Sequence, residues 1–323
     1  MMSKILIIGK IPPPIGGVTI HTSRLLDYLN RERIEYTFYN NLNFNLLTFV
    51  YSIWKANKAH IHIRNPFFLF VFTLLCRTLN TYSIITIHGN IYSYNKIMSF
   101  FESLAVRISN KVILLNNSSY ETALKLNSKA VLMSAFITPI IVERLKMDII
   151  NKINDAKLNS KKVFCTNAYS LTYDKNGNEI YGITELVDYF NEKGNIFLFI
   201  SDPKGIYYDY FLEKKVKINK NIKFIVGSHP FIEVIKSTDC FIRNTTTDGD
   251  SISINEALYF DKKVIATNCV NRPKTVIIYG HKTDLTLADA IDVVLKSKCE
   301  PTKNKPKNAA VELVKLYSDS YEN

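Results

Sequence analysis

Short apolar runs alternate with longer segments of helical periodicity along the first half of the chain. The run KILIIGK, at Lys4–Lys10, has the near-continuous apolar character of a buried strand in a parallel sheet. A turn containing Gly16 and Gly17 follows, and apolar residues then recur at the spacing of one helix face: Val18, Ile20, Leu25, Leu26 and Leu29. The order of strand, glycine turn and helix predicts the opening of a doubly wound α/β domain.

The same alternation continues as far as residue 136. We expect strands at Ala59–Arg64, Tyr82–Gly89, Asn110–Asn116 and Lys129–Phe136, and helices at Pro66–Leu79, Asn95–Ser109 and Ser118–Leu126. The most hydrophobic segment, Pro66–Cys76, is shorter than the roughly 20 apolar residues that span a bilayer. We therefore favour a buried helix there over an interfacial one. Strands joined by helices predict a parallel sheet that is covered on both faces.

A polar, charged stretch at Lys152–Lys162 separates two halves of similar pattern. The alternation resumes at Val163–Ser170, and 323 residues exceed what one core usually supports. We expect further strands at Asn195–Ser201, Asn221–Gly227, Cys240–Arg243 and Lys262–Asn268, and helices at Gly182–Gly194, Tyr207–Ile218, His229–Asp239 and Asp250–Asp261. These features predict an α/β protein with two tandem Rossmann-like domains, at residues 1–158 and 159–300, and a basic linker with a C-terminal helix at residues 301–323. Because ligands bind beyond the carboxyl ends of strands in such sheets, we expect the two domains to face a ligand-binding cleft.

The formal net charge of +12 favours an anionic partner, and the charge alone leaves open a nucleic acid, an acidic membrane surface or a phosphorylated ligand. The lysines are dispersed and often lie beside asparagine, so an ordinary solvated basic surface explains the charge equally well. The five cysteines form no C-x-x-C pair and have no histidine at zinc spacing. This usage fits a reduced, cytoplasmic setting.

Gly16 and Gly17 are the first candidate ligand contacts. Glycines between a strand and a helix let backbone N–H groups approach a phosphate, and the helix N-terminus adds a favourable field. The sequence has neither the G-x-G-x-x-G fingerprint of dinucleotide-binding proteins nor a G-x-x-x-x-G-K-[ST] phosphate loop, which argues against a dehydrogenase. A tight turn without a ligand is the alternative explanation of this glycine pair.

His88 is the second candidate, because it ends an apolar strand and is followed by Gly89. This position directs it toward the expected cleft, where its ring would donate to a hydroxyl or a phosphate. A structural role is the alternative. His21 is a weaker candidate, and His60 and His62 share one face of a strand, so we expect them to be structural.

The segment TTTDGDSISINEAL follows a predicted strand and therefore lies at the carboxyl end of that strand. Ser251, Ile252 and Ser253 would form the first turn of a helix, where free N–H groups receive phosphate oxygens. Glu256 lies one to two turns further along and would accept hydrogen bonds from the two hydroxyls of a ribose.

Charged residues surround the start of this helix. Asp248 and Asp250 would cap the helix or contact sugar hydroxyls, and Arg243 would contact a diphosphate. Plain helix capping is one alternative, although it explains only one of these side chains. A metal clamp built from the Asp-Gly-Asp sequence is a second alternative, which the tandem layout disfavours.

The stretches IPPPIGGVTIH, TIHG and DGDSISINEALYFDKKVIATN together resemble glycosyltransferase family 4 and its relatives, which share the GT-B fold. The resemblance covers nearly the whole chain in order. The family carries two glutamates separated by seven residues, and this spacing falls on Asp248 and Glu256, with Asp in place of the first Glu. The resemblance implies that Glu256 binds the donor ribose and that Asp248 lies beside the donor sugar. We assign His88 and Asp248 as catalytic residues.

The chain departs from the family pattern where a lysine usually helps to hold the donor diphosphate. Tyr181-Gly182-Ile183 stands at the expected Lys-Gly-Ile position, so that lysine is missing. Lys175, Arg243 or Arg272 would supply the positive charge instead.

These observations predict a glycosyltransferase, of the hexosyltransferase type, that moves a sugar from a nucleoside-diphosphate donor to a lipid-linked or growing bacterial surface glycan, such as capsule or O-antigen. The resemblance implies retention at the anomeric carbon. We expect no metal and no cofactor, because backbone amides and a nearby cation would stabilise the departing diphosphate.

We expect the protein in the cytoplasm, held peripherally on the anionic inner face of the plasma membrane, and without a nucleic-acid partner. The alternatives are a sugar-nucleotide epimerase of the same fold and a non-enzymatic basic protein that binds nucleic acid or membrane.

Overall fold

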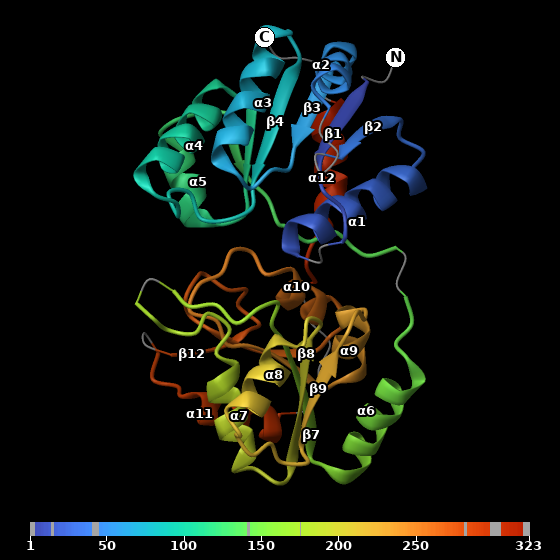
Figure 1. Cartoon of the computed structure of the whole chain (residues 1–323), viewed down its shortest axis with the longest axis vertical. Helices are drawn as coiled ribbons and strands as arrows, with labels where there is room; N and C mark the ends of the chain where they lie inside the picture. The colour runs from blue at the N-terminus through green and yellow to red at the C-terminus, as the bar shows by residue number, and fades with distance from the viewer. Residues whose placement is uncertain are drawn as a thin grey trace. The chain divides into compact units, whose positions relative to one another are not determined.

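The structure is a computed structural model that describes residues 4–13, 16–40, 45–140, 143–174, 176–280, 283–297 and 305–318. Its contacts divide the chain into unit 1, which comprises Met1–Ile140, Gly249–Ser251 and Lys307–Asn323, and unit 2, which comprises Ile141–Asp248 and Ile252–Pro306. Each unit has one six-stranded parallel sheet with helices packed on it (Figure 1). The predicted pair of doubly wound α/β domains is therefore confirmed.

The sheet of unit 1 has the strand order β2-β1-β3-β4-β5-β6. Its strands are β1 (Ile5–Gly9), β2 (Tyr36–Asn40), β3 (Lys58–Ile61), β4 (Tyr82–Ile87), β5 (Lys111–Leu114) and β6 (Ala130–Leu132). The chain leaves β1 toward β2 on one side and returns to β3 on the other, so the order reverses between β1 and β3. The carboxyl ends of strands at such a reversal are where open α/β sheets bind ligands.

Asparagine side chains start most of the helices in unit 1. Its helices are α1 (Gly17–Arg31), α2 (Leu46–Lys55), α3 (Pro66–Thr78), α4 (Lys96–Ile108), α5 (Asn117–Leu124) and α12 (Ala309–Ser318). The caps Asn45, Asn65, Asn95 and Asn116 each accept a hydrogen bond from a backbone N–H in the first turn of α2, α3, α4 and α5. Each cap satisfies a donor that the helix itself leaves unpaired.

The C-terminal helix α12 packs on unit 1, although the chain reaches it only after unit 2. The buried Lys58 Nζ donates to the carbonyl oxygens of Leu316 and Tyr317, at 3.0 and 2.9 Å. The amine thus satisfies carbonyls in the last turn of the helix, where a positive charge is also favoured by the helix dipole. The expected C-terminal helix at residues 301–323 is therefore part of the first domain.

The sheet of unit 2 has the strand order β12-β11-β10-β7-β8-β9. Its strands are β7 (Lys162–Asn167), β8 (Ile196–Asp202), β9 (Ile222–Val226), β10 (Cys240–Arg243), β11 (Lys263–Thr267) and β12 (Ile277–Tyr279). Its helices are α6 (Met147–Asn159), α7 (Ile183–Asn191), α8 (Ile206–Glu213), α9 (Phe231–Ser237), α10 (Ile252–Tyr259) and α11 (Leu287–Lys296). In this sheet the strand order reverses between β7 and β10.

Helix α6 belongs to the second domain. We expected the boundary at residue 158, but Ile149 and Ile153 of α6 are buried in a core with Val163, Phe241 and other residues of unit 2. The polar sequence of this segment suggested a linker because only one side of the helix is apolar. The contacts place the boundary near Ile140 instead.

Several short elements have no counterpart among the predicted ones: β2, α2, β12 and α11. β2 and β12 are edge strands, and only one residue of each is buried. The apolar signal that identifies a strand is weak where so little of it enters the core.

The apolar segment at Pro66–Cys76 forms most of α3, as predicted, but only one side of the helix is buried. Leu69, Phe72 and Cys76 enter the core, whereas Phe67 and Phe68 are exposed. Within the described part of the chain, no helix combines the length and the apolar character needed to cross a membrane.

Candidate functional site

The carboxyl ends of β7 and β10 flank the point where the strand order of unit 2 reverses. Asn167 is the last residue of β7, and Arg243 is the last residue of β10. Arg272 approaches the same point from the loop after β11, where its Nε donates to the carbonyl oxygen of Thr267 at 3.2 Å. Three neighbouring strands thus deliver polar side chains to the position where α/β sheets bind ligands.

Asp248 binds both arginines at this point. Arg243 donates from Nε to Oδ2 and from Nη2 to Oδ1 of Asp248, both at 3.1 Å. Arg272 donates from Nη1 to Oδ2 at 2.9 Å. Paired guanidinium donors fix a carboxylate in a plane, and such charge-assisted bonds are stronger than neutral ones. We call Arg243, Asp248 and Arg272 the arginine–aspartate cluster.

The cluster carries one net positive charge. Burial acts to raise the pKa of the Asp248 carboxyl, but the charges of Arg243 and Arg272 outweigh burial and lower this pKa. Burial acts to lower the pKa of Arg243, and the Asp248 carboxylate outweighs that effect and raises it. Asp248 is therefore a carboxylate near neutral pH, and it lies between two arginine side chains. Such an arrangement can receive a further negative charge.

Tyr181 occupies the position at which the resemblance implied a lysine, and its ring lies beside the cluster. The guanidinium carbon of Arg243 is 5.5 Å from the centre of the Tyr181 ring. This distance is within the range of a cation–π contact. The positive charge near Tyr181 thus comes from Arg243. Lys175, another candidate for the missing lysine, lies outside the described residues.

The loop that carries Tyr181 is fixed by Gly182 and Asn244. Gly182 has a φ of +55°, and a Cβ atom at this position would lie 2.4 Å from Nδ2 of Asn244. Asn244 donates to the Gly182 carbonyl oxygen and to Glu185, both at 2.9 Å. Only glycine combines this backbone conformation with so close a neighbour. The sequence indicated the motif but not its partner Asn244.

Glu179 caps α7 and holds the other side of the same loop. Its carboxylate accepts from the backbone N–H of Ile183 at 2.6 Å and of Thr184 at 3.2 Å, and from the Tyr207 hydroxyl at 2.7 Å. A carboxylate at a helix N-terminus satisfies free donors and interacts favourably with the helix dipole. Sequence reasoning missed this residue, which stands four positions before the helix.

The expected helix after the Asp-Gly-Asp sequence is present as α10. Ile252 and Ser253 lie in its first turn, and Glu256 is a buried residue in its middle. The contacts assign Gly249–Ser251 to unit 1. There Asp250 Oδ2 accepts from Ser134 Oγ at 2.8 Å and from the Ala135 N–H at 2.7 Å.

The two aspartates of the Asp-Gly-Asp sequence thus bind different partners. Asp248 binds arginines, whereas Asp250 binds a hydroxyl and a backbone N–H. Among the described residues, no group of three or more His, Cys, Asp and Glu side chains is arranged to hold a metal ion.

In unit 1, α1 starts at Gly17 directly after Gly16, as the glycine pair predicts. Gly16 has an extended backbone with φ near −172°, which any residue can adopt. A Cβ on Gly17 would meet no atom within 4 Å, and a Cβ on Gly16 would meet only Thr19 Oγ1 at 3.9 Å. Neither the backbone conformation nor the packing requires glycine here. The backbone above the glycine pair is therefore open in this unit, and a phosphate contact and a plain turn both remain compatible with it.

Four histidines meet near the strand reversal of unit 1. His62 follows β3, His88 follows β4 and His21 lies on α1; Nδ1 of His62 is 3.1 Å from Nε2 of His88. The His21 ring centre is 5.3 Å from that of His62 and 5.2 Å from that of His88. His60 lies behind His62 with its ring centre 4.0 Å away. We call these residues the histidine cluster.

The histidine cluster is neutral near pH 7. Burial and the neighbouring histidines lower the pKa of His62 and His88 far below the usual value, and burial lowers those of His21 and His60 to about 4 and about 3. His88 is therefore a neutral hydrogen-bonding group. We expected His21 to be a weak candidate and His60 and His62 to be structural. The shared strand face of His60 and His62 was the sequence signal that their rings lie close together.

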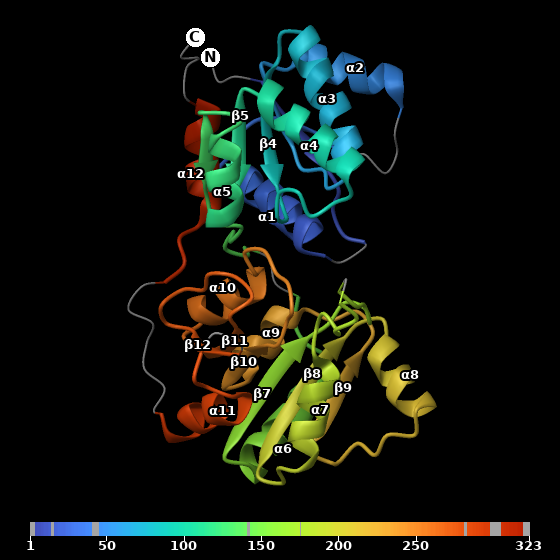
Figure 2. The ribbon, with the colours of Figure 1, turned by 90° about the vertical axis from the view of Figure 1, so that its left-hand side faces the viewer.

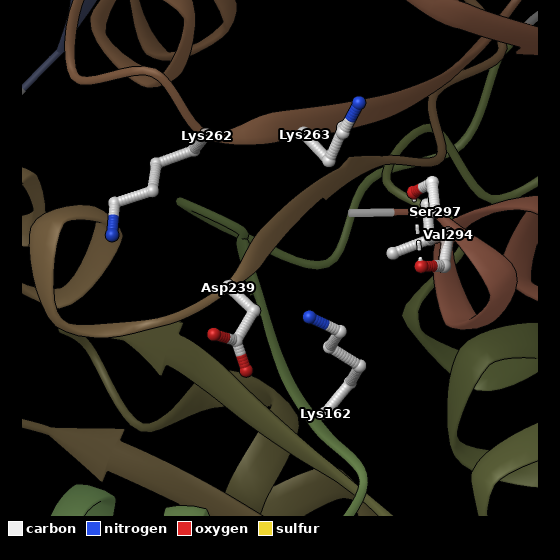
Figure 3. Close-up of a pocket in the computed structure, with 6 residues that line it drawn as sticks. All are labelled: Lys162, Asp239, Lys262, Lys263, Val294 and Ser297. Carbon is white, nitrogen blue, oxygen red and sulfur yellow. Dashed lines mark hydrogen bonds between the residues drawn. The ribbon is translucent and has the colours of Figure 1, made fainter. Parts of the chain in front are cut away.

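A small cavity at the amino-terminal ends of the unit 2 strands does not suit a large ligand. It lies at the amino-terminal ends of β7 and β11 and is lined by Lys162, Asp239, Lys262, Lys263, Val294 and Ser297 (Figure 3). Its volume of about 40 Å³ has room for little more than one water molecule. This cavity is therefore not the candidate site.

No protein-family model matches the sequence, and no curated protein has a significantly similar sequence. Solved structures with the same fold are numerous. HepE from Anabaena, solved in complex with UDP-glucose, matches with a TM-score of 0.68 and 11% identity over 98% of this chain and 95% of HepE.

Two further solved structures belong to this group. A glycosyltransferase from Rickettsia africae has a TM-score of 0.66 and 15% identity, covering 97% of this chain and 98% of its own. WaaG, a glycosyltransferase involved in lipopolysaccharide biosynthesis, has a TM-score of 0.62 and 12% identity, covering 98% of this chain and 96% of its own. These neighbours are GT-B glycosyltransferases, so the predicted GT-B class, with two Rossmann-like domains, is confirmed as a fold.

Proposed function

We propose that this chain is a glycosyltransferase that moves a sugar from a nucleoside diphosphate to a lipid-linked or growing bacterial surface glycan. The observation that carries this proposal is the arginine–aspartate cluster at the strand reversal of unit 2. Its net positive charge suits a diphosphate. The similarity in fold to HepE, solved with UDP-glucose, and to WaaG, which acts in lipopolysaccharide biosynthesis, supports the donor and acceptor classes.

The donor nucleotide would bind at the start of α10 and along its buried face. The backbone N–H groups at Ser251, Ile252 and Ser253, at the start of this helix, would receive phosphate oxygens. The buried Glu256 would accept hydrogen bonds from the ribose hydroxyls. Arg243 would replace the missing lysine at Tyr181, with Arg272 and Lys175 as further donors to the diphosphate.

The arginines would assist the bond-breaking step. The bond between the anomeric carbon and the diphosphate oxygen would break with its electron pair left on the diphosphate. The oxygen of an acceptor hydroxyl would form the new bond to the same carbon, and the hydroxyl proton would leave with the diphosphate. Preorganised positive charge stabilises such a leaving group without rearrangement during the reaction. Asp248 would hold both guanidinium groups in place beside the donor sugar, and the backbone at Gly16 and Gly17 would approach the phosphates.

His88 would hydrogen-bond the transferred sugar. As a neutral imidazole bonded to His62, it has one ring nitrogen, Nδ1, left to bond a hydroxyl. We further propose that the reaction retains the anomeric configuration and uses no metal. We also propose that the enzyme is a cytoplasmic hexosyltransferase of capsule or O-antigen synthesis that acts peripherally on the inner membrane. The net charge of +12 supports the last of these points, because it favours an anionic surface.

The test is a thermal-shift panel of UDP-, GDP- and dTDP-sugars, followed by transfer of the best donor's radiolabelled sugar to lipid-linked acceptors from bacterial membranes. We expect one nucleotide class to raise the Tm and Glu256→Gln to abolish both the shift and the transfer. Glu213→Gln, an exposed change at the end of α8, is the matched control.

The result that would overturn the proposal is the absence of a thermal shift with every sugar nucleotide, or full transfer by Glu256→Gln. Conversion of the donor sugar into its epimer without an acceptor would instead identify an epimerase.

A further inference from the structure

Helix α2 presents a second apolar face to the outside of unit 1. Phe49 and Ile53 point into the core and are fully buried. Leu47, Tyr51 and Trp54 follow one another at spacings of four and three residues, which places them on one common face. They are 82%, 52% and 63% exposed. A helix that only covers a sheet needs one apolar stripe, so the second stripe requires another explanation.

Helix α4, which packs against α3, also exposes large apolar side chains. Ile97 and Phe100, three residues apart on α4, are 66% and 59% exposed. Helix α3 contacts both α2 and α4 (Figure 2). The ring centres of Phe49 on α2 and Phe72 on α3 are 4.2 Å apart, and those of Phe67 on α3 and Phe101 on α4 are 5.1 Å apart. We call Leu47, Tyr51, Trp54, Ile97 and Phe100 the aromatic face.

The segment that carries the aromatic face has very few acidic residues. The sequence from Leu46 to Ile108 has one acidic residue, Glu102, and six basic residues: Lys55, Lys58, Arg64, Arg77, Lys96 and Arg107. Glu102 is buried and accepts a hydrogen bond from the Tyr92 N–H at 2.9 Å, whereas Lys55 and Lys96 are exposed. The whole chain has 41 basic and 29 acidic residues, so this segment differs from the rest chiefly in its lack of acidic residues.

This combination fits the surface of an anionic membrane. Tryptophan and tyrosine prefer the interface between headgroups and acyl chains, where one part of the ring system is apolar and another is polar. Basic residues beside them attract anionic headgroups. On α2 the two groups are adjacent, because Lys55 Nζ lies 4.6 Å from the centre of the Tyr51 ring.

We propose that the aromatic face of α2 and α4 docks unit 1 on a bilayer surface rich in anionic lipids, with Trp54 in the interfacial layer. The inference deepens the proposed function, in which the protein works at such a membrane. It stands apart from sugar transfer, because docking needs neither donor nor acceptor.

The test uses the full-length protein and vesicles of phosphatidylcholine, with and without phosphatidylglycerol. Trp54 is the only tryptophan in the chain, so its emission reports this helix alone. We expect a blue shift and co-sedimentation with the anionic vesicles, and weaker binding to neutral vesicles or at high salt. An unchanged Trp54 emission on bound protein would overturn the proposal, as would an absence of binding.

Paired variants test the two components of the surface. We expect Leu47→Gln with Trp54→Gln, or Ile97→Gln with Phe100→Gln, to weaken co-sedimentation about tenfold or more. The matched control is Leu158→Gln with Leu212→Gln, two exposed leucines of unit 2. Lys55→Gln with Lys96→Gln should weaken binding to a similar degree, since each basic residue near an anionic surface contributes about fivefold. Lys157→Gln with Lys214→Gln is its control.

Wild-type binding by both aromatic-face variants would overturn the proposal. So would a dimer that forms in solution through this face, is lost in the Leu47→Gln and Trp54→Gln variant, and binds no vesicles. Thermal shifts with UDP-, GDP- and dTDP-sugars in the absence of vesicles test the proposed function separately, so either conclusion can fail while the other stands.

Discussion

Arg243 and Asp248 are joined by two parallel hydrogen bonds, from Nε to Oδ2 and from Nη2 to Oδ1, each 3.1 Å long. Both side chains are largely buried, and Arg272 adds a third bond to the same carboxylate. The planar guanidinium matches the planar carboxylate, which a lysine ammonium cannot reproduce. The pair therefore sets the direction of the remaining N–H groups of Arg243, one of which, on Nη1, donates to Asn167 Oδ1 at 3.5 Å.

Arg243→Lys should weaken binding of a nucleoside diphosphate by about tenfold, or about 1.4 kcal/mol. The charge is kept, but the fixed orientation is lost. Isothermal titration with UDP, GDP and dTDP measures the change. The exposed Arg31→Lys is the control and should bind as the wild type does. Equal affinity in Arg243→Lys would remove this side chain from the donor site.

Gly17→Ala tests whether a phosphate must approach the backbone at Gly17 or whether the glycine only forms an ordinary turn. The structure leaves room for the methyl group, and Ala is favoured over Gly in a helix by about 1 kcal/mol, so the Tm should stay the same or rise. The KM for the sugar nucleotide should rise about tenfold because the methyl group blocks close approach of the phosphate. Gly194→Ala, where an added Cβ also meets no atom, is the control and should leave the KM unchanged. An unchanged KM in Gly17→Ala would favour the plain turn.

Acid should destabilise the protein through its buried histidines. Burial lowers the pKa of His21 to about 4 and that of His60 to about 3, whereas an unfolded histidine titrates near 6.5. As the pH falls from 6.5 toward 4, the unfolded chain takes up protons that the folded chain cannot, so the folded state loses stability. At pH 5 each of these histidines costs about 2 kcal/mol.

Urea unfolding at pH 7 and pH 5 measures this loss. The free energy of unfolding should differ between pH 7 and pH 5 by about 2 kcal/mol less in His21→Gln than in the wild type, whatever the effect of the substitution at pH 7. If the free energy of unfolding changed equally between pH 7 and pH 5 in the variant and the wild type, the lowered pKa assigned to His21 would be wrong. NMR titration of the His21 ring gives its pKa directly.

Glu179→Gln should lower the free energy of unfolding by about 1–2 kcal/mol. The amide has no charge to offer the α7 dipole and only one oxygen for the three donors that Glu179 now satisfies. Denaturant unfolding measures the change. Glu192→Gln, at the other end of α7, should be nearly neutral because that residue is exposed. Similar losses in both variants would argue against a specific cap.

Chelation should leave sugar transfer unchanged. Both carboxylate oxygens of Asp248 already accept hydrogen bonds from guanidinium groups, which lowers their availability to a metal ion. Transfer measured after dialysis against EDTA should match the untreated enzyme. A loss of activity that Mg²⁺ or Mn²⁺ restores would establish a metal-dependent reaction instead.

Much of the fold could be predicted from local sequence patterns. The apolar run before Gly16 and Gly17 became β1 and α1, and the segment after Arg243 became the turn and helix that hold Asp248 and Glu256. Strand and helix formation depend on the spacing of apolar residues over one or two turns, which a sequence displays directly. Edge strands such as β2 were missed because they bury too little to give that signal.

The sequence by itself determined two doubly wound domains and which residues lie at strand ends. Only the tertiary structure decided that Asp248 binds Arg272 from another loop, that His62 contacts His88, and that Lys58 anchors a helix 258 residues further along the chain. These contacts join residues from different strands. They depend on the order of strands in each sheet, and that order is a property of the whole packed core, which no local pattern encodes.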